Sequence, residues 1–219
     1  MSEPDNCTNG TQNGRDELRG ADRYALMIRG AKLVSESGQY LCIIRDVSET
    51  GVRLRLFHTL PPAPQLALEL ANGDFFFIER VWERDEEAGF RFAAPIDIHA
   101  FMEEPSPYPR RPLRLRIRLD ALIFTGDTAR DAVLLDLSQY GARVETPRPL
   151  AIGQMLKLEA AGLPPLFARV CWRLNPQHGL VFQQTFAFDR LARVAGGLQG
   201  CGEQAGRPGL MDAGQARYG

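Results

Sequence analysis

The sequence contains almost no lysine. Of its 26 basic residues only Lys32 and Lys157 are lysines, and the other 24 are arginines. A genome rich in G and C produces such a bias without any function, so the positions of the arginines decide what they mean. The formal net charge is −1, which argues against electrostatic capture of nucleic acid or anionic lipid by the chain as a whole. A local basic patch stays open, since the planar guanidinium group can bind phosphate and guanine.

Long apolar runs are absent as well. Runs such as residues 41–44 and 75–78 hold four residues each, far fewer than the roughly 18 that a membrane-spanning helix needs. The first ten residues, MSEPDNCTNG, are polar and acidic, and they lack the basic and apolar regions of a signal peptide. We therefore expect a cytoplasmic protein without a membrane span.

Cysteine is scarce and its spacing is uninformative. No two cysteines form a CxxC pair, and no histidine stands at ligand spacing from any of them, which argues against a disulfide framework and a zinc site. Two of them lie in apolar runs, where we expect buried, reduced thiols. These two are Cys42 and Cys171.

A repeat is the most informative feature that the sequence does contain. Residues 46–54 (DVSETGVRL) and 136–144 (DLSQYGARV) both read DxSxxG followed by alternating apolar positions, and they lie 90 residues apart. The same offset separates Trp82 from Trp172, the only two tryptophans, and residues 89–92 from residues 179–182. Three landmarks in one register indicate a duplicated unit of about 90 residues.

The boundaries of the two copies follow from composition. Residues 103–109 (EEPSPYP) hold three prolines, which is typical of a semi-rigid linker. We therefore place the first copy at residues 15–102 and the second at residues 110–194. Residues 1–14 are expected to form a disordered tail, and residues 195–219, rich in glycine, a flexible one.

Within each copy the pattern favours β-strands. Val52, Leu54 and Leu56 alternate with arginines, and Asn72-Gly73 is a hairpin signal before the apolar stretch at residues 75–82. Five or six short strands in about 90 residues suggest a closed barrel, because closure removes exposed edges. The prediction is mainly β: two tandem small antiparallel six-stranded barrels, each followed by a short helix, with both tryptophans packed in the cores.

An arginine pair precedes each DxSxxG motif. RxxxR occupies residues 19–23 and begins 27 residues before Asp46, and it occupies residues 110–114 and begins 26 residues before Asp136. This order of motifs, found twice, resembles the PilZ domain, in two tandem copies that cover nearly all of the chain outside the tails. The resemblance implies a six-stranded barrel that binds the bacterial second messenger cyclic di-GMP and passes the signal on through a change of shape or partner.

The resemblance also implies a cyclic di-GMP site in each copy, with arginines on one side of the nucleotide and the DxSxxG motif on the other. In the second copy its residues would be Arg110, Arg111, Arg114, Asp136, Ser138 and Gly141. In the first copy, the weaker match, they would be Arg19, Arg23, Asp46, Ser48 and Gly51. The first copy places Asp22 inside its RxxxR motif, so a degenerate first domain that packs against or regulates the second is an alternative.

The chemistry of these residue types suits such a ligand. Guanidinium groups can neutralise both phosphates bidentately and can donate to guanine or stack on it. An ionised aspartate accepts from the N–H groups of guanine, while glycine allows close backbone approach or a positive φ. We expect the arginine segment to be mobile when empty and ordered by the ligand.

Rival functions have less support. We expect no enzyme, cofactor or metal site, because the sequence has no GxSxG, Walker or HExxH motif and its three histidines show no mutual spacing; those histidines are expected at the surface or in turns. Five arginines in residues 110–118 could track a nucleic acid, but no aromatics are interleaved with them. The main alternative is a protein-interaction module without nucleotide binding, in which DxSxxG is a plain turn signal. In either case a protein effector partner is expected.

Overall fold

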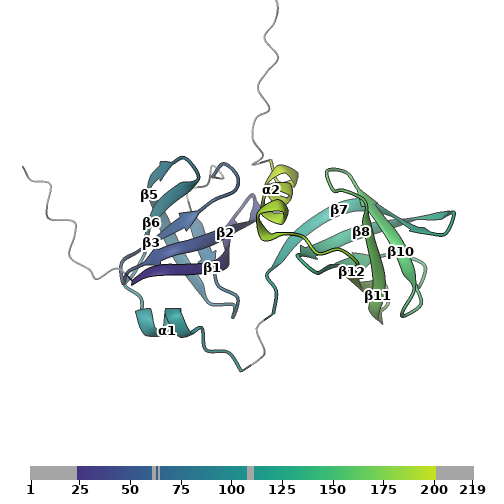
Figure 1. Cartoon of the computed structure of the whole chain (residues 1–219), viewed down its shortest axis with the longest axis horizontal. Helices are drawn as coiled ribbons and strands as arrows, with labels where there is room; N and C mark the ends of the chain where they lie inside the picture. The colour runs from purple at the N-terminus through teal and green to yellow at the C-terminus, as the bar shows by residue number, and fades with distance from the viewer. Residues whose placement is uncertain (1–23, 61–62, 64, 108–110, 201–219) are drawn as a thin grey trace, which may run out of the picture.

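The computed structural model describes residues 24–60, 63, 65–107 and 111–200. Within them the chain forms two closed six-stranded antiparallel β-barrels in tandem, joined by a linker and with a helix after each (Figure 1). This arrangement confirms the predicted fold class.

The first barrel has the strand order β1-β2-β3-β6-β5-β4, and β1 closes the barrel by pairing with β4. A six-residue helix, α1 (Ile98–Glu103), follows it. The strands are β1 (Tyr24–Ser35), β2 (Gly38–Val47), β3 (Gly51–Arg55), β4 (Leu66–Glu69), β5 (Phe75–Arg84) and β6 (Glu87–Phe92).

The second barrel repeats this order with β7 to β12, and β7 closes on β10. Helix α2 (Phe188–Leu198) follows it. The strands are β7 (Arg114–Thr125), β8 (Thr128–Ser138), β9 (Gly141–Glu145), β10 (Met155–Ala160), β11 (Leu166–Leu174) and β12 (Gln177–Phe182).

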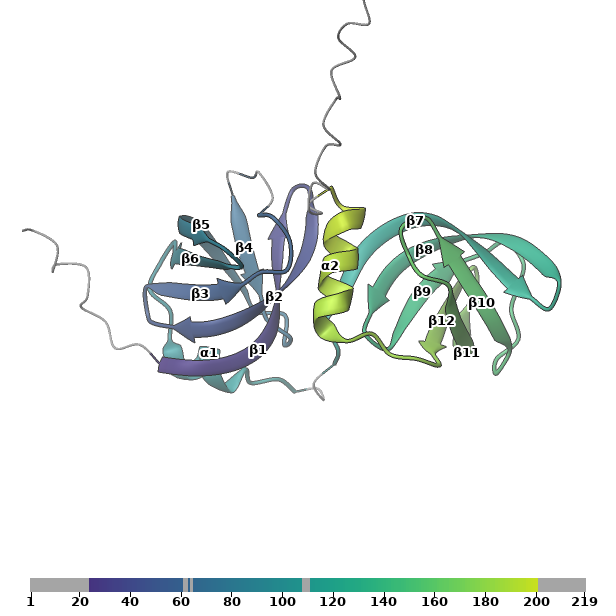
Figure 2. The same ribbon diagram turned by 45° about the horizontal axis from the view of Figure 1, so that its top comes forward.

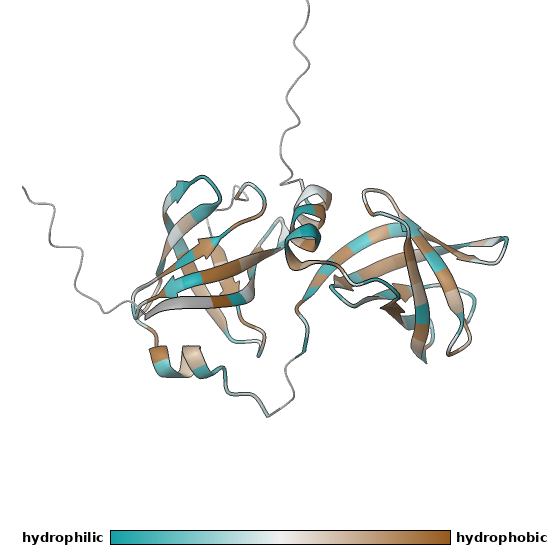
Figure 3. Cartoon of the chain, viewed as in Figure 1, coloured by the Kyte–Doolittle hydropathy of each residue, from teal (hydrophilic) through white to brown (hydrophobic). Residues whose placement is uncertain are grey.

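The alternation along each strand explains why these residues form barrels. In β7, Leu115 and Ile117 are buried while Arg114 and Arg116 are exposed, as expected where one face of a strand meets the core and the other meets water. The same change of polarity shows as alternating bands along β7 in Figure 3.

Equivalent strands of the two barrels pair in the same register, except for one difference in the first strand of each barrel. The pairing of β7 with β8 shifts between Arg116 and Leu119, and that of β1 with β2 shifts between Ala25 and Arg29. The bulge in β1 therefore contains one residue more. This extra residue accounts for the different spacing of the two RxxxR motifs from their DxSxxG motifs.

Each helix buries an apolar residue against the barrel that precedes it. Asp97 caps α1 by accepting hydrogen bonds from His99 N and Ala100 N, and Phe101 is buried against Phe76 and Phe92. The equivalent residue of α2, Leu191, is buried in the core of the second barrel.

Helix α2 also contacts the first barrel, and it lies between the two barrels in both views (Figure 2). Phe188 packs against Phe57 with ring centroids 6.0 Å apart. Gln199, which follows the helix, accepts a hydrogen bond from Gln39 N at 2.8 Å and donates one to Gln39 O at 2.7 Å. Leu41 of β2 belongs to the same buried cluster as the second barrel's core.

The start predicted for the C-terminal tail needs correction. Residue 195 was the predicted beginning of a flexible segment, but α2 continues to Leu198, and Ala195 and Gly196 are buried. A Cβ at residue 196 would lie 2.7 Å from Cβ of His58. The glycine is thus explained by close packing against the first barrel and is not a sign of flexibility.

No helix in the described part of the chain is long and apolar enough to cross a membrane.

Candidate functional site

The predicted residues Arg114 and Asp136 lie side by side on adjacent strands. Arg114 is the first residue of β7, and its Nη1 donates to Oδ1 of Asp136 in β8 at 2.7 Å. The arginine side chain is 51% exposed, whereas that of the aspartate is 9% exposed. The carboxylate is therefore fixed in the barrel wall, and the guanidinium group projects from it into solvent.

A second arginine, which the sequence analysis did not assign to the site, meets the same carboxylate. Nε of Arg143 in β9 lies 2.8 Å from Oδ2 of Asp136, and the two residues are register partners. The pairing of β8 with β9 shifts immediately before Asp136, and such bulges commonly re-aim a side chain. A signal for Arg143 was present, because both copies carry arginine two residues after the glycine of DxSxxG.

Ser138 and Gly141 have a structural role in the turn between β8 and β9. The hydroxyl of Ser138 donates to Gly141 O at 3.0 Å and accepts from Gly141 N at 3.2 Å, and the serine is 1% exposed. Gly141 does not have a positive φ. A Cβ at this position would lie 2.0 Å from Leu180 O, so glycine is required by the close approach of β12.

Trp172 lies in line with Arg143 across neighbouring strands of the barrel. Arg143 is paired with Gly179 in β12, and Gly179 is paired with Trp172 in β11. The indole ring lies over the glycine, because a Cβ there would fall 1.9 Å from Nε1 of Trp172. Trp172 is 39% exposed, so its predicted place in the core is wrong. The same is true of Trp82, which covers Gly89 and is 43% exposed.

The other arginines of the RxxxR motif at residues 110–114 lie ahead of β7. Arg111 is exposed ahead of β7, and Arg110 lies outside the described residues. The backbone N–H of Arg116 donates to Oε1 of Gln39 at 2.9 Å, so the start of β7 is attached to the first barrel. The candidate site thus lies where the linker enters the second barrel.

The first barrel repeats part of this arrangement. Nε of Arg53 donates to Oδ2 of Asp46 at 2.6 Å, and the hydroxyl of Ser48 and the backbone of Gly51 form the same turn as in the second copy. Arg53 is also bonded to Glu87 at 3.2 Å. The equivalent of Glu87 in the second barrel is Gln177, which is neutral. The predicted Arg19 and Arg23 lie outside the described residues.

The charge of the neighbouring turn distinguishes the two barrels. In the first barrel, residues 83–87 (ERDEE) contribute four carboxylates beside Trp82 and line a hollow of about 980 Å³. The equivalent residues 173–177 (RLNPQ) contain no carboxylate and one arginine. A hydrogen bond from Arg55 lowers the pKa of Glu86, which keeps that carboxylate ionised. Arg45, Arg55 and Arg84 line the same hollow and leave one carboxylate in excess. An anion is therefore less favoured at this turn of the first barrel than at the turn of the second.

Two further expectations from the sequence are wrong. Cys171 is exposed, whereas Cys42 is buried as expected. His178, predicted at the surface or in a turn, is fully buried, with Nε2 accepting from Leu150 N at 3.1 Å. Among the described residues, no group of three or more histidine, cysteine, aspartate or glutamate side chains could hold a metal ion.

Comparison with sequence families matches residues 108–194 to the family described as the PilZ domain. This segment contains Arg114, Asp136 and Arg143 and all six strands of the second barrel. A comparison with curated proteins gave no match.

The solved structures that match this chain include three bacterial proteins. The Bacillus subtilis inhibitor of motility (MotI/DgrA) is 13% identical, with a TM-score of 0.34 over 79% of this chain and 95% of its own. Borreliella burgdorferi PlzA in complex with c-di-GMP is 12% identical, with a TM-score of 0.31 over 76% of this chain and 86% of its own. Escherichia coli YcgR in complex with c-di-GMP is 11% identical, with a TM-score of 0.32 over 75% and 80%. The sequence match to the PilZ domain covers residues 108–194, which form the second barrel.

Proposed function

We propose that the protein is a receptor for cyclic di-GMP, because its second barrel matches the PilZ domain and its first barrel has the same strand order. The ligand would bind on the outer wall of the second barrel, over Arg114, Asp136 and Arg143. The observation that supports this most directly is the pair of arginines that meet one fixed carboxylate within the segment matched to the family.

The charges of this cluster suit a ligand with two phosphates and two guanines. Two arginines against one aspartate leave excess positive charge, and Arg111 adds to it. The half-exposed Arg114 can turn from Asp136 to a phosphate and form a charge-assisted, bidentate contact. Asp136 would then accept from the N–H groups of a guanine. Ser138 and Gly141 would contribute by shaping the turn that holds Asp136 in place.

We propose that the first barrel binds this ligand weakly or not at all. Its Arg53 is shared between Asp46 and Glu87, and four carboxylates line the neighbouring turn. An anionic nucleotide would have to compete with two carboxylates for Arg53 and approach a turn that has one carboxylate in excess. The first barrel would then serve as the body against which the second barrel moves or is held.

The position of the site suggests how binding could change the shape of the protein. Gln39 of the first barrel accepts from Arg116 N of β7 and is also hydrogen-bonded to Gln199 after α2. A ligand that pulls residues 110–114 onto the second barrel would act on this junction directly. The expected output is a change in how the barrels are held together, or in how they meet an effector protein.

Isothermal titration of the full chain with cyclic di-GMP tests the proposal. We expect saturable binding, weakened at least about tenfold by Arg110→Ala or Arg114→Ala, because each charge-assisted hydrogen bond contributes about 1.5–3 kcal/mol. Arg148→Ala, an exposed arginine in the loop after β9, is the matched control and should leave the affinity within about twofold.

Three outcomes would count against the proposal. Unchanged affinity in both arginine variants would remove the assigned site. A titration without heat and without a rise in melting temperature at saturating ligand would favour an interaction module that does not bind nucleotides. Steeply salt-dependent binding of long oligonucleotides with no response to cyclic di-GMP would favour a nucleic-acid-binding barrel.

A further inference from the structure

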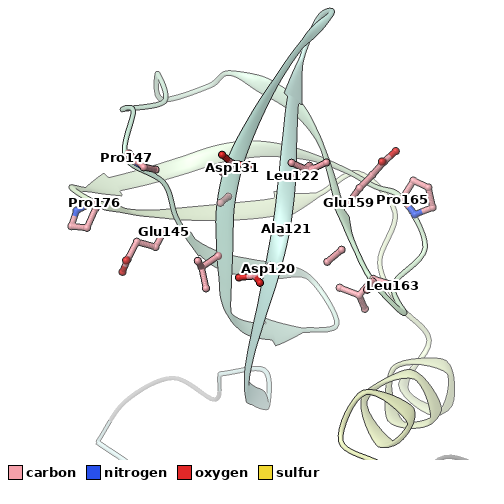
Figure 4. Close-up of a pocket in the computed structure, with 14 residues that line it drawn as sticks. Asp120, Ala121, Leu122, Asp131, Glu145, Pro147, Glu159, Leu163, Pro165 and Pro176 are labelled. Carbon is pink, nitrogen blue, oxygen red and sulfur yellow. The ribbon is translucent and has the colours of Figure 1, made fainter.

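A second hollow lies on the outer side of the second barrel and has no role in the proposed nucleotide site. Its volume is about 920 Å³, and it extends over β10, β7, β8 and the end of β9 (Figure 4). Prolines lie at its two ends, with Pro147 and Pro176 on one side and Pro165 on the other. Four carboxylates line it, namely Asp120, Asp131, Glu145 and Glu159.

The internal repeat identifies the equivalent surface on the first barrel. Asp120 pairs with Val133 in the second barrel, and Gly30 pairs with Ile43 in the first, in the same register. The surface that corresponds to the hollow therefore lies on β1, β2 and the end of β3. Six of its positions, each 90 residues before a residue of the hollow, are Gly30, Leu41, Ile43, Arg55, Phe57 and Glu86.

In the first barrel this surface is covered by a helix. Phe188 of α2 lies over Gly30, where a Cβ would come within 2.7 Å of its ring. The same Phe188 packs against Phe57, and Arg193 of α2 lies 3.7 Å from Glu86 and over the Phe57 ring. The first repeat thus uses this face as a helix-docking face.

We propose that the hollow on the second barrel is the corresponding docking face and that it takes a helix from a partner protein. Helix α2 lies to one side of the hollow and does not cross it in Figure 4. The second barrel provides α2 to the first barrel, and within the described residues no third barrel provides a helix to the second. The hollow occupies the same strand positions as the face of the first barrel that α2 covers, and small and acidic side chains line it.

The charges specify what kind of helix fits. Going from the first barrel to the second, Gly30 becomes Asp120, Leu41 becomes Asp131 and Arg55 becomes Glu145. None of these three carboxylates forms an ion pair within the described residues, whereas Glu159 lies 2.8 Å from Lys157. The complementary partner is an amphipathic helix with lysine or arginine on its docking face.

Other occupants fit this charge pattern poorly. Helix α1 of a second copy, with the sequence IHAFME, has no lysine or arginine. Helix α2 of a second copy is already packed between its own barrels. A nucleic acid would meet four carboxylates of its own sign.

A synthetic helix can test the docking face on the full chain. The probe is a fluorescently labelled peptide with the sequence of residues 187–199 and the changes F188A and D189K. The first change removes the ring that packs on Gly30 and would meet Asp120 here, and the second adds basic charge. We expect saturable binding at or below about 100 μM, with amide shifts of Asp120, Asp131 and Val133 in an NMR titration. A scrambled peptide of the same composition should not bind saturably.

Variants of the carboxylates give the matched comparison. The double variant Asp120→Arg/Glu145→Arg should weaken peptide binding at least about tenfold. Asp127→Arg, the same charge change in the turn between β7 and β8, should stay within about twofold. Cyclic di-GMP titration of the double variant should be unchanged, which separates this face from the nucleotide site.

Each of the other outcomes would overturn the proposal. These are no saturable binding up to about 1 mM peptide, equal binding of the scrambled peptide, equal binding to the double variant, or amide shifts confined to Gly30, Leu41 and Ile43. Self-association in sedimentation experiments that Asp120→Arg abolishes would instead assign the face to a second copy of this chain.

Discussion

Arg114 and Asp136 form an ion pair in which one partner is fixed and the other is free to turn. The aspartate is 9% exposed and is also held at 2.8 Å by Arg143, whereas the arginine is 51% exposed and begins its strand. A phosphate competing with Asp136 for Arg114 would need to reorient only the arginine. In the proposed site the carboxylate is thus already held in place, and the Arg114 side chain is the part that can turn.

Replacing this carboxylate should affect the two barrels differently. Asp136→Ala leaves Arg114 and Arg143 without their common anchor, so we expect affinity for cyclic di-GMP to fall at least about tenfold. Stability should fall by about 1–3 kcal/mol, since the buried Nε of Arg143 loses its charged neighbour. Asp46→Ala, the equivalent change in the first barrel, should keep the affinity within about twofold. Calorimetry with urea unfolding measures both quantities, and equal losses in the two variants would contradict a single dominant site.

The glycines of the two DxSxxG motifs should differ in their tolerance of a side chain. A Cβ at Gly141 would lie 2.0 Å from Leu180 O, and one at Gly51 would lie 2.9 Å from Phe90 O. Both contacts are with backbone, which yields little. We expect Gly141→Ala to lower the free energy of unfolding by about 1–3 kcal/mol or more, and Gly51→Ala to have the smaller effect. Urea unfolding curves measure the difference, and the reverse order would show that the two turns are not packed as described.

The buried His178 should make stability depend on pH. Burial lowers its pKa, and the charge of Arg173 lowers it further. The unfolded chain takes up the proton near pH 6.5 and the folded chain only at lower pH, so stability is complete above about pH 7 and falls as the pH drops below about 6.5, by up to about 1.4 kcal/mol per pH unit.

Removing the titrating group tests this dependence. His178→Gln keeps an acceptor for Leu150 N and should flatten the decrease in stability between about pH 7 and pH 5, followed by thermal unfolding. Burial also lowers the pKa of His58, so a smaller slope should remain, and His58→Gln should remove that part. An unchanged slope in the His178 variant would mean that this imidazole is protonated in the folded protein.

Much of the fold was predictable because it rests on periodic patterns that occur twice. The alternation in β3 and β7, the Asn72-Gly73 hairpin and the shared offset of 90 residues all depend on local sequence. The two closed barrels follow from these patterns, since each strand needs a partner on both sides.

The parts that the sequence did not predict depend on contacts between distant segments. The indole ring of Trp172 packs over Gly179 on the next strand instead of in the core. The packing of Gly196 against His58 joins residues 138 positions apart, so a glycine-rich sequence alone does not reveal it. The contact of Arg143 with Asp136 depends on the pairing of β8 with β9, and the sequence indicates it only through the arginine two residues after each DxSxxG glycine.

The position of α2 between the two barrels has a consequence for fragments that contain only one barrel. A fragment that stops before residue 110 would leave Leu41 and Phe57, now 1% and 7% exposed, facing water. The complementary fragment would uncover Phe188 and the outer side of its own helix. Neither fragment would keep the surface of the intact protein, and both would expose hydrophobic patches that promote aggregation.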